Sequence, residues 1–185
     1  MIAIIGQVAA GKSLLLHNLN KLGYKTFSCD VFVHELYEKE FFIEQINNLI
    51  NKKTKHLKEE IIAWLKTDKN NIYKLENIVF PHVYRHLQNN SYDFVEIPVL
   101  QSLNWDFSTF FKAIIKVVIS EEKREQNLKF RNVNNSLYDE LNQKNHTFLN
   151  KNELFNAIPI VNISYENVKT IQENDLFFRH IKHYL

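Results

Sequence analysis

The sequence predicts an α/β fold, a three-layer sandwich in which helices cover both faces of a five-stranded parallel sheet. Five short apolar runs alternate along the chain with helical patterns, which is the order of elements that such a fold requires. The runs show little alternation of polar and apolar residues, as is typical of strands buried on both faces. A length of 185 residues suits one domain, so we expect a single domain over residues 1–185.

The predicted elements follow one another without an internal repeat, a flexible linker or a low-complexity tract. We expect strands at residues 1–5, 25–28, 93–98, 113–119 and 157–163, with the first strand in the centre of the sheet. The clearest helical patterns cover residues 11–22, 57–67, 71–88, 121–130 and 174–184. Ser120 is a good N-cap for the helix that starts at Glu121. The stretch 31–88 is helical and too long for a plain crossover, so it predicts a helical insert.

Composition narrows the choice of partners and location. An apolar content of 45% can fill a core, and a formal net charge of +2 does not describe a polycation built for duplex nucleic acid. No segment is long and apolar enough for a membrane span, and the N-terminal run lacks the basic region of a secretory signal. The one cysteine, Cys29, leaves no second cysteine for an internal disulfide, which favours a cytoplasmic location.

A glycine-containing loop follows the first predicted strand. Residues 6–13 read Gly-Gln-Val-Ala-Ala-Gly-Lys-Ser, which is the pattern of a phosphate-binding P-loop. The chain has three glycines, against roughly a dozen at average usage, and two of them occupy the glycine positions of this pattern. An apolar strand precedes the loop and an amphipathic helix follows it, which is the context that a P-loop needs.

The residue types of the loop indicate a nucleoside triphosphate as the ligand. Backbone N–H groups can surround a phosphate where no side chain blocks the approach, and the helix N-terminus adds its dipole. We expect Lys12 to reach the β- and γ-phosphates and the Ser13 hydroxyl to bind Mg²⁺. The predicted nucleotide-binding residues are Gly6, Gln7, Val8, Ala9, Ala10, Gly11, Lys12, Ser13 and Leu14.

Asp30 is the second candidate site residue. It follows the second predicted strand, and ligands of open α/β sheets bind along the edge where the strands end. A carboxylate there can orient and deprotonate an acceptor hydroxyl, or touch the metal through water. The alternative is that Asp30 only caps a helix that begins at Val31, and its position alone favours neither interpretation.

With these features the sequence resembles the dephospho-CoA kinases, which are nucleoside-monophosphate-kinase-like P-loop proteins. The resemblance is spread over most of the chain. Beyond the P-loop it includes Leu22-Gly23 leading into a strand that ends in Asp30, and the segments 78–81, 96–100, 116–119, 120–131 and 183–185. The proline-containing segment around Pro98 and the helix after Ser120 resemble the family most, because many other families share the P-loop.

The resemblance implies ATP-dependent phosphorylation of the ribose 3′-hydroxyl of dephospho-CoA, which gives CoA and ADP. It implies that Asp30 activates this hydroxyl and that the insert at 31–88 binds the acceptor. Residues 121–156 would form a lid whose basic side chains neutralise the transferred phosphoryl group. The catalytic residues would then be Asp30, Lys12 and Arg131, with Arg124, Lys129, Lys144 and Lys151 as further basic residues of the lid.

The chain also departs from the family pattern. Ser28 stands where the family has the first acid of an Asp-x-Asp motif, Phe80 precedes Pro81 where the family has histidine, and Gln101 replaces an acid. Two alternatives therefore stay open, another small-molecule kinase for nucleosides or nucleotides, and a nucleotide-binding module without catalysis. From the sequence we expect ATP and dephospho-CoA as partners. We expect neither a nucleic acid nor a membrane as a partner, and the sequence predicts no particular oligomeric state.

Histidines and aromatic residues of the insert have less specific interpretations. His82 and His86 are four residues apart on a helical pattern, but no acid or cysteine completes a metal-binding set, so a solvated or groove-lining face is the better interpretation. Other side chains could line a pocket for pantetheine or adenine, although helical spacing favours core positions for most of them: Phe41, Phe42, Trp64, Tyr73 and Phe80.

Overall fold

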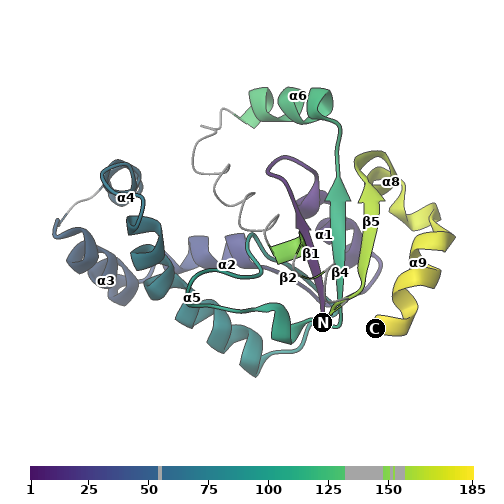
Figure 1. Cartoon of the computed structure of the whole chain (residues 1–185), viewed down its shortest axis with the longest axis horizontal. Coiled ribbons are helices and arrows are strands. Elements are labelled where there is room, and N and C mark those ends of the chain that lie inside the picture. Colours follow the sequence, from purple (N-terminus) through teal and green to yellow (C-terminus); the bar gives the residue numbers. More distant parts are fainter. Residues whose placement is uncertain (54–55, 132–147, 151, 153–156) are drawn as a thin grey trace. The chain divides into compact units, whose positions relative to one another are not determined.

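The computed structural model describes residues 1–53, 56–131, 148–150, 152 and 157–185. Its sheet has five strands in the order β2-β3-β1-β4-β5, and every neighbouring pair is parallel (Figure 1). The strands are β1 (Ile2–Gly6), β2 (Thr26–Ser28), β3 (Phe94–Glu96), β4 (Ala113–Val118) and β5 (Ile160–Ser164). The five-stranded parallel sheet and the central position of the first strand are confirmed.

Helices fill most of the described segments between these strands. They are α1 (Lys12–Lys21), α2 (Cys29–Leu36), α3 (Glu40–Ile50), α4 (Leu57–Leu65), α5 (Asn71–Asn89), α6 (Glu121–Arg131), α8 (Tyr165–Lys169) and α9 (Asp175–Ile181). Each predicted helical pattern coincides with one of them to within a few residues, but the pattern at 174–184 is divided, since a 3₁₀ turn (Lys182–Tyr184) follows α9. Within the described part of the chain, no helix combines the length and the apolar character that crossing a membrane requires.

The chain forms two compact units. The sheet unit contains Met1–Cys29, Ser91–Gln101 and Asp106–Leu185, and the helical unit contains Asp30–Asn90 and Ser102–Trp105. All five strands and the helices α1, α6, α8 and α9 belong to the sheet unit. The helices α3, α4 and α5, and all of α2 beyond its first residue, belong to the helical unit.

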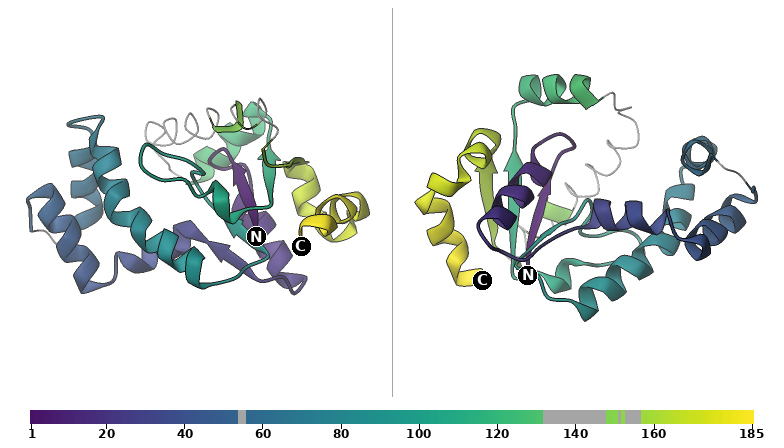
Figure 2. Two further views of the ribbon diagram at one scale, coloured as in Figure 1. Left: turned by 60° about the horizontal axis from the view of Figure 1, so that its bottom comes forward. Right: turned by 180° about the vertical axis from the view of Figure 1, so that it is seen from behind.

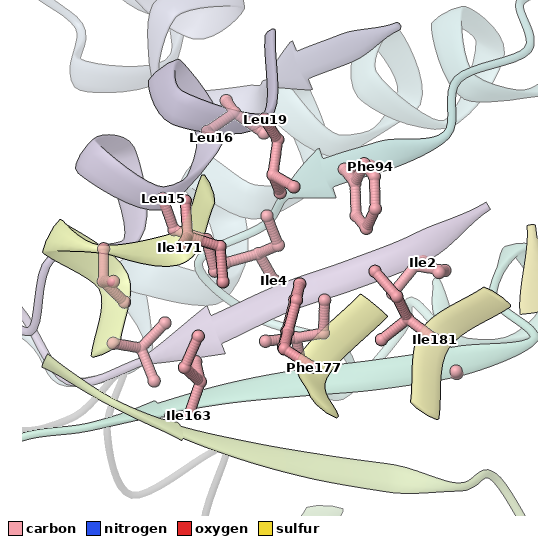
Figure 3. Close-up of a cluster of buried hydrophobic side chains, with 14 of the residues drawn as sticks. Ile2, Ile4, Leu15, Leu16, Leu19, Phe94, Ile163, Ile171, Phe177 and Ile181 are labelled. Carbon is pink, nitrogen blue, oxygen red and sulfur yellow. The ribbon is translucent and has the colours of Figure 1, made fainter. Parts of the chain in front are cut away.

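The main core of the sheet unit lies between the sheet and the helices on one of its faces (Figure 3). Its fully or nearly fully buried side chains include Ile2, Ile4, Leu15, Leu16, Leu19, Phe94, Phe177 and Ile181. Burial of one such side chain contributes about 1.5–3 kcal/mol to folding. Ala3 and Ile5, which alternate with these residues on β1, are buried as well. Burial on both faces explains why the strand patterns lack alternation.

Short polar contacts set the ends of the helices in this unit. Gly23 has a φ of +92°, a backbone conformation that suits glycine, and it stops the chain from continuing α1. The Ser120 hydroxyl accepts a hydrogen bond from the Lys123 N–H at 3.3 Å, so the predicted N-cap of α6 is confirmed. The side chain of Asn174 caps α9 by accepting a hydrogen bond from the Phe177 N–H at 3.0 Å. In both views of Figure 2 the C-terminal helices, α8 and α9, lie beside the β4–β5 side of the sheet.

The helical unit has its own core between α3, α4 and α5. Its buried apolar side chains include Phe42, Ile46, Ile61, Ile72, Val79, Val83 and Leu87. Among the aromatic residues considered above, Phe42 is therefore core, whereas Phe41 is half exposed. The indole of Trp105 packs against Phe80 and Tyr84 and donates from Nε1 to Asn77 at 3.2 Å.

The two histidines of α5 lie among aromatic rings. His86 is 4.6 Å from the Phe32 ring, and His82 is 5.6 Å from the Phe42 ring and 5.7 Å from the Phe41 ring, between centroids. Burial lowers the pKa of both histidines, with Arg85 adding to the effect at His82. Both side chains consequently favour the neutral state, as expected of aromatic packing partners. Within the described chain, no cluster of three or more histidine, cysteine or acidic residues could hold a metal ion.

Candidate nucleotide-binding site

The predicted P-loop lies at the junction between β1 and α1. β1 ends at Gly6 and α1 begins at Lys12, so residues 7–11 make the turn at the carboxyl end of the central strand. A Cβ atom at Gly6 would lie 2.7 Å from the carbonyl oxygen of Val117 on β4. Gly11 has a φ of +100°, and a Cβ there would lie 2.8 Å from the ring of Tyr165. The two glycines of the motif are therefore required by close neighbours as well as by the turn.

The N-terminus of α1 is arranged to receive an anion. Its N-cap residue, Gly11, has no side chain to satisfy the first N–H groups, and the first turn carries no acidic residue. By contrast, the first turns of α3, α4, α6 and α9 each contain an acid. No side-chain cap competes with an anion for these N–H groups, and the positive end of the helix dipole favours negative charge there.

Lys12 is the cation of the loop. Its Nζ atom donates hydrogen bonds to the backbone oxygens of Gly6 and Gln7, at 3.0 Å each. The flexible side chain thus lies over the loop, with its ammonium group at carbonyl oxygens that are weaker acceptors than a phosphate.

A carboxylate that the sequence analysis did not select, Glu96, lies beneath the start of α1. It is the last residue of β3, only 3% of its surface is exposed, and it is in register with Ile4 and Ser28. Ser13 Oγ donates to Glu96 Oε1 at 3.0 Å, and Ser28 Oγ donates to Oε2 at 3.3 Å. Burial of a carboxylate is expensive without such donors, so the two hydroxyl groups hold Glu96 in place.

Helix α6 touches the loop from the carboxyl end of β4 (Figure 1). The side-chain amide of Asn127 donates to the backbone oxygen of Ala9 at 3.0 Å. One turn earlier, the guanidinium of Arg124 pairs with Glu121, and its side chain is only 11% exposed. Its Nε atom is buried and has no acceptor among the described residues. Arg124 is therefore a partly desolvated cation on the helix face that also carries Asn127.

Tyr165, the first residue of α8, forms another wall of the loop. Its ring edge lies against Gly11, and the ammonium of Lys169 lies 4.7 Å from the ring centroid. Lys169 also pairs with Glu166 at 2.8 Å, and this hydrogen bond raises the pKa of Lys169. The aromatic ring is thus held between the phosphate loop and a cation that stays charged at neutral pH.

The other predicted site residues lie in different parts of the chain, and some of them are outside the described residues. Asp30 is exposed in the first turn of α2, in the helical unit, one residue after Cys29 of the sheet unit. α2 begins at Cys29, two residues before the predicted start at Val31, so Asp30 lies in the first turn of the helix. Leu14 is 37% exposed on α1. The side chain of Arg131, and Lys144 and Lys151, lie outside the described residues; Arg131 is the last residue of α6.

The strand–loop–helix junction, the lysine on the loop and the serine–glutamate pair beneath it define a P-loop nucleotide-binding protein of the α/β kinase class. The dephospho-CoA kinase of Rickettsia typhi is 32% identical over 132 residues, which cover 68% of each chain. That of Rickettsia prowazekii is 32% identical over 142 residues, again over 68% of each chain. No family model matches the sequence. The chain belongs to the dephospho-CoA kinase family.

Two solved structures share the fold. TT1252 from Thermus thermophilus superimposes with a TM-score of 0.64 at 19% identity and covers 95% of both chains. The dephospho-CoA kinase from Campylobacter jejuni gives a TM-score of 0.50 at 19% identity, over 93% of this chain and 95% of that one. At 19% identity these structures support the α/β P-loop architecture, but they do not assign individual site residues.

The contact between Gly11 and Tyr165 leads to a prediction about the loop. Gly11→Ala should lower the Tm more than Gly23→Ala, although both glycines have a similar positive φ. Backbone strain is common to the two variants and costs about 1–2 kcal/mol, or roughly 2–8 °C for a chain of this size. Only Gly11→Ala adds a collision with a ring, since no heavy atom lies within 4 Å of a Cβ at Gly23.

Thermal unfolding of the two variants, of Tyr165→Ala and of Gly11→Ala/Tyr165→Ala tests the cause. The double variant should lose less stability than the sum of the single variants, because removal of the ring also removes the collision. Equal losses at Gly11 and Gly23, with additive behaviour in the double variant, would contradict the contact.

Proposed function

We propose that this protein transfers the γ-phosphoryl group of ATP to the ribose 3′-hydroxyl of dephospho-CoA, which yields CoA and ADP. The observation that carries the proposal is the junction of β1 and α1, with Lys12 on the loop and Ser13 bonded to the buried Glu96, in a member of the dephospho-CoA kinase family. A loop of this kind that served only as a turn would need neither the lysine nor the buried acid.

The nucleotide would bind through the backbone of residues 6–14. N–H groups of the loop and of the first turn of α1 would donate to the phosphates, since no side chain caps them. Lys12 would leave the carbonyl oxygens of Gly6 and Gln7 and move its charge to the β- and γ-phosphates. In this position it would stabilise the charge that accumulates on the leaving group in the transition state.

Ser13 and Glu96 fit a magnesium ion. The pair offers a hydroxyl and a carboxylate oxygen, the ligands that Mg²⁺ prefers, and Mg²⁺ usually takes its remaining ligands from water and phosphate. Ser13 would bind the ion directly, while Glu96 would orient the serine or accept from a bound water. Bound Mg²⁺ would neutralise the phosphate oxygens and help to hold the triphosphate in place.

The helical insert at 31–88 would bind the acceptor, and Asp30 would activate its hydroxyl group. Asp30 is exposed and ionisable, and it comes two residues after Ser28, the last residue of β2. Its carboxylate could accept the proton of the 3′-hydroxyl as that oxygen attacks phosphorus. In the insert, the half-exposed Phe41 ring next to His82 offers apolar and aromatic surface to an acceptor that contains adenine and pantetheine.

The basic residues of 121–156 would act as a lid over the transferred group. Arg131 is the proposed catalytic arginine, and Arg124 lies two turns before it on α6. Arg124 would need to exchange Glu121 for a phosphoryl oxygen, a stronger acceptor for a guanidinium. The proposal includes a cytoplasmic location, because the buried Cys29 is not part of a disulfide and the proposed substrates are metabolites.

Acceptor selectivity tests the proposed substrate. ATP consumption by the purified protein should depend on dephospho-CoA and should be negligible with AMP, CMP, thymidine or adenosine. A coupled assay of ADP release over this panel measures the choice, with heat-treated protein as the background. If a nucleoside or nucleotide exceeds dephospho-CoA in kcat/KM, the acceptor assignment is wrong and only the kinase class remains.

Asp30→Asn tests the proposed base. The change keeps the shape and removes the charge, so kcat should fall by roughly 10²- to 10⁴-fold, the usual range for general acid–base catalysis. The Kd for ATP should barely change, because nucleotide binding rests on the loop. Asp175→Asn is the matched control, since Asp175 is also an acid in the first helical turn, on α9. Turnover of Asp30→Asn within about threefold of wild type would exclude the base role.

Glu96→Gln tests the metal site. The amide keeps the size of the side chain but loses the charge and one acceptor, so the Mg²⁺ concentration for half-maximal activity should rise by roughly 10- to 100-fold, as for other residues that support metal ligands. Glu76→Gln, at a glutamate of α5 that is also buried, is the control for replacement of a buried carboxyl group by an amide. An unchanged Mg²⁺ dependence in Glu96→Gln would show that Glu96 only supports the fold.

A further inference from the structure

The peptide between Ala9 and Ala10 determines the course of the phosphate loop. Ala9 has a φ of +67°, an unusual value for a residue with a side chain, and it is buried. The N–H of Ala10 donates to the Gln7 oxygen at 3.1 Å, inside the loop. The oxygen of the same planar peptide, on Ala9, points the opposite way and accepts from Asn127 on α6 at 3.0 Å. Both ends of the peptide plane are therefore held.

The backbone conformation of this peptide has a cost that its contacts must offset. Alanine lacks the freedom of glycine in the left-handed region, so other backbone conformations compete unless an outside contact selects this one. The N–H groups of Gly11, Lys12 and Ser13 follow directly in the chain, and their directions depend on the orientation of the 9–10 peptide. A hydrogen bond at the Ala9 oxygen thus acts on the donors that a phosphate would use.

Asn127 is itself fixed by rigid elements. α6 begins three residues after Val118, the last residue of β4, and β4 pairs with β1 up to the register Gly6–Val117. The Ser120 cap sets the start of the helix, and the buried Leu128 holds the adjacent position against the unit. The loop follows β1 and α6 follows the neighbouring strand β4. The Asn127 amide therefore approaches the loop from a helix that is anchored to the same part of the sheet.

We propose that Asn127 is a positioning residue for the phosphate loop, which keeps the Ala9–Ala10 peptide in the orientation that binds nucleotide. This inference rests on the proposed function, because it assumes that the loop binds the phosphates of ATP. It also gives α6 a second role: the helix that carries Arg124 and ends at Arg131 is connected by one hydrogen bond to the loop on which the phosphates would lie.

Two substitutions remove the bond in different ways. Asn127→Ala deletes the donor and favours the helix, so the fold should be retained. Asn127→Asp keeps the shape but places a carboxylate oxygen against the Ala9 oxygen and near the phosphates. The matched control is Asn18→Ala: the Asn18 amide also donates to a backbone oxygen, that of Val168 at 2.9 Å, and it too is half-buried, but it lies away from the loop.

Titration calorimetry with ADP and Mg²⁺, steady-state kinetics and thermal unfolding form the test. The Kd for ADP and the KM for ATP should rise roughly tenfold in Asn127→Ala, the factor that corresponds to one hydrogen bond, and further in Asn127→Asp. The KM for dephospho-CoA should stay within about twofold in both variants. Asn18→Ala should bind ADP like the wild type, even where its Tm falls as much as that of Asn127→Ala.

The outcomes separate this inference from the function on which it rests. A wild-type protein that binds neither ADP nor ATP would overturn the proposed function and the role of Asn127 together. Wild-type binding with an unchanged Kd in both Asn127 variants would overturn the role of Asn127 alone. An equal loss of ADP affinity in Asn18→Ala would do the same, because the effect would then follow general stability.

Discussion

The constraint on which the rest of this structure depends is the close passage of the chain from β1 into α1. The turn requires two positions without side chains, since Val117 O and the Tyr165 ring approach within 3 Å of where a Cβ would lie. It also requires a helix that is held firmly behind it, which the burial of Leu15 and Leu19 against the sheet provides. The parallel sheet determines the edge at which the loop lies, because the carboxyl ends of all its strands are at the same edge.

The core and the site meet at Glu96. Phe94 and Glu96 alternate with Val95 on β3 and share a face, so the strand that buries an aromatic ring under α1 also presents a carboxylate under its first turn. A chain selected for stability alone would place an apolar residue at this buried position. The presence of an acid, satisfied by the hydroxyls of Ser13 and Ser28, indicates that the position serves the loop.

Much of the fold could be predicted because its signals are local. Strands buried on both faces gave apolar runs, and in a chain with three glycines the spacing of Gly6 and Gly11 stood out. The supporting residues carry no such signal. Glu96 lies within a predicted strand, and the strand pattern does not mark it as a site residue. Asn127 and Tyr165 contact the loop from helices that follow β4 and β5. Their roles depend on strand order, which sequence periodicity does not specify.

The departure from the family pattern at Ser28 has a physical explanation in the same contact. An aspartate at this position would be in register with Glu96 and would place two carboxylates side by side, where like charges disfavour ionisation of both. Serine instead donates a hydrogen bond to Glu96 Oε2 at 3.3 Å and adds no charge. Ser13 donates to the other oxygen, so each oxygen of Glu96 accepts a hydrogen bond from a serine hydroxyl. The replacement is therefore compatible with the hydrogen bonds that hold Glu96 beneath the loop, and Asp30 remains the one acid of that motif.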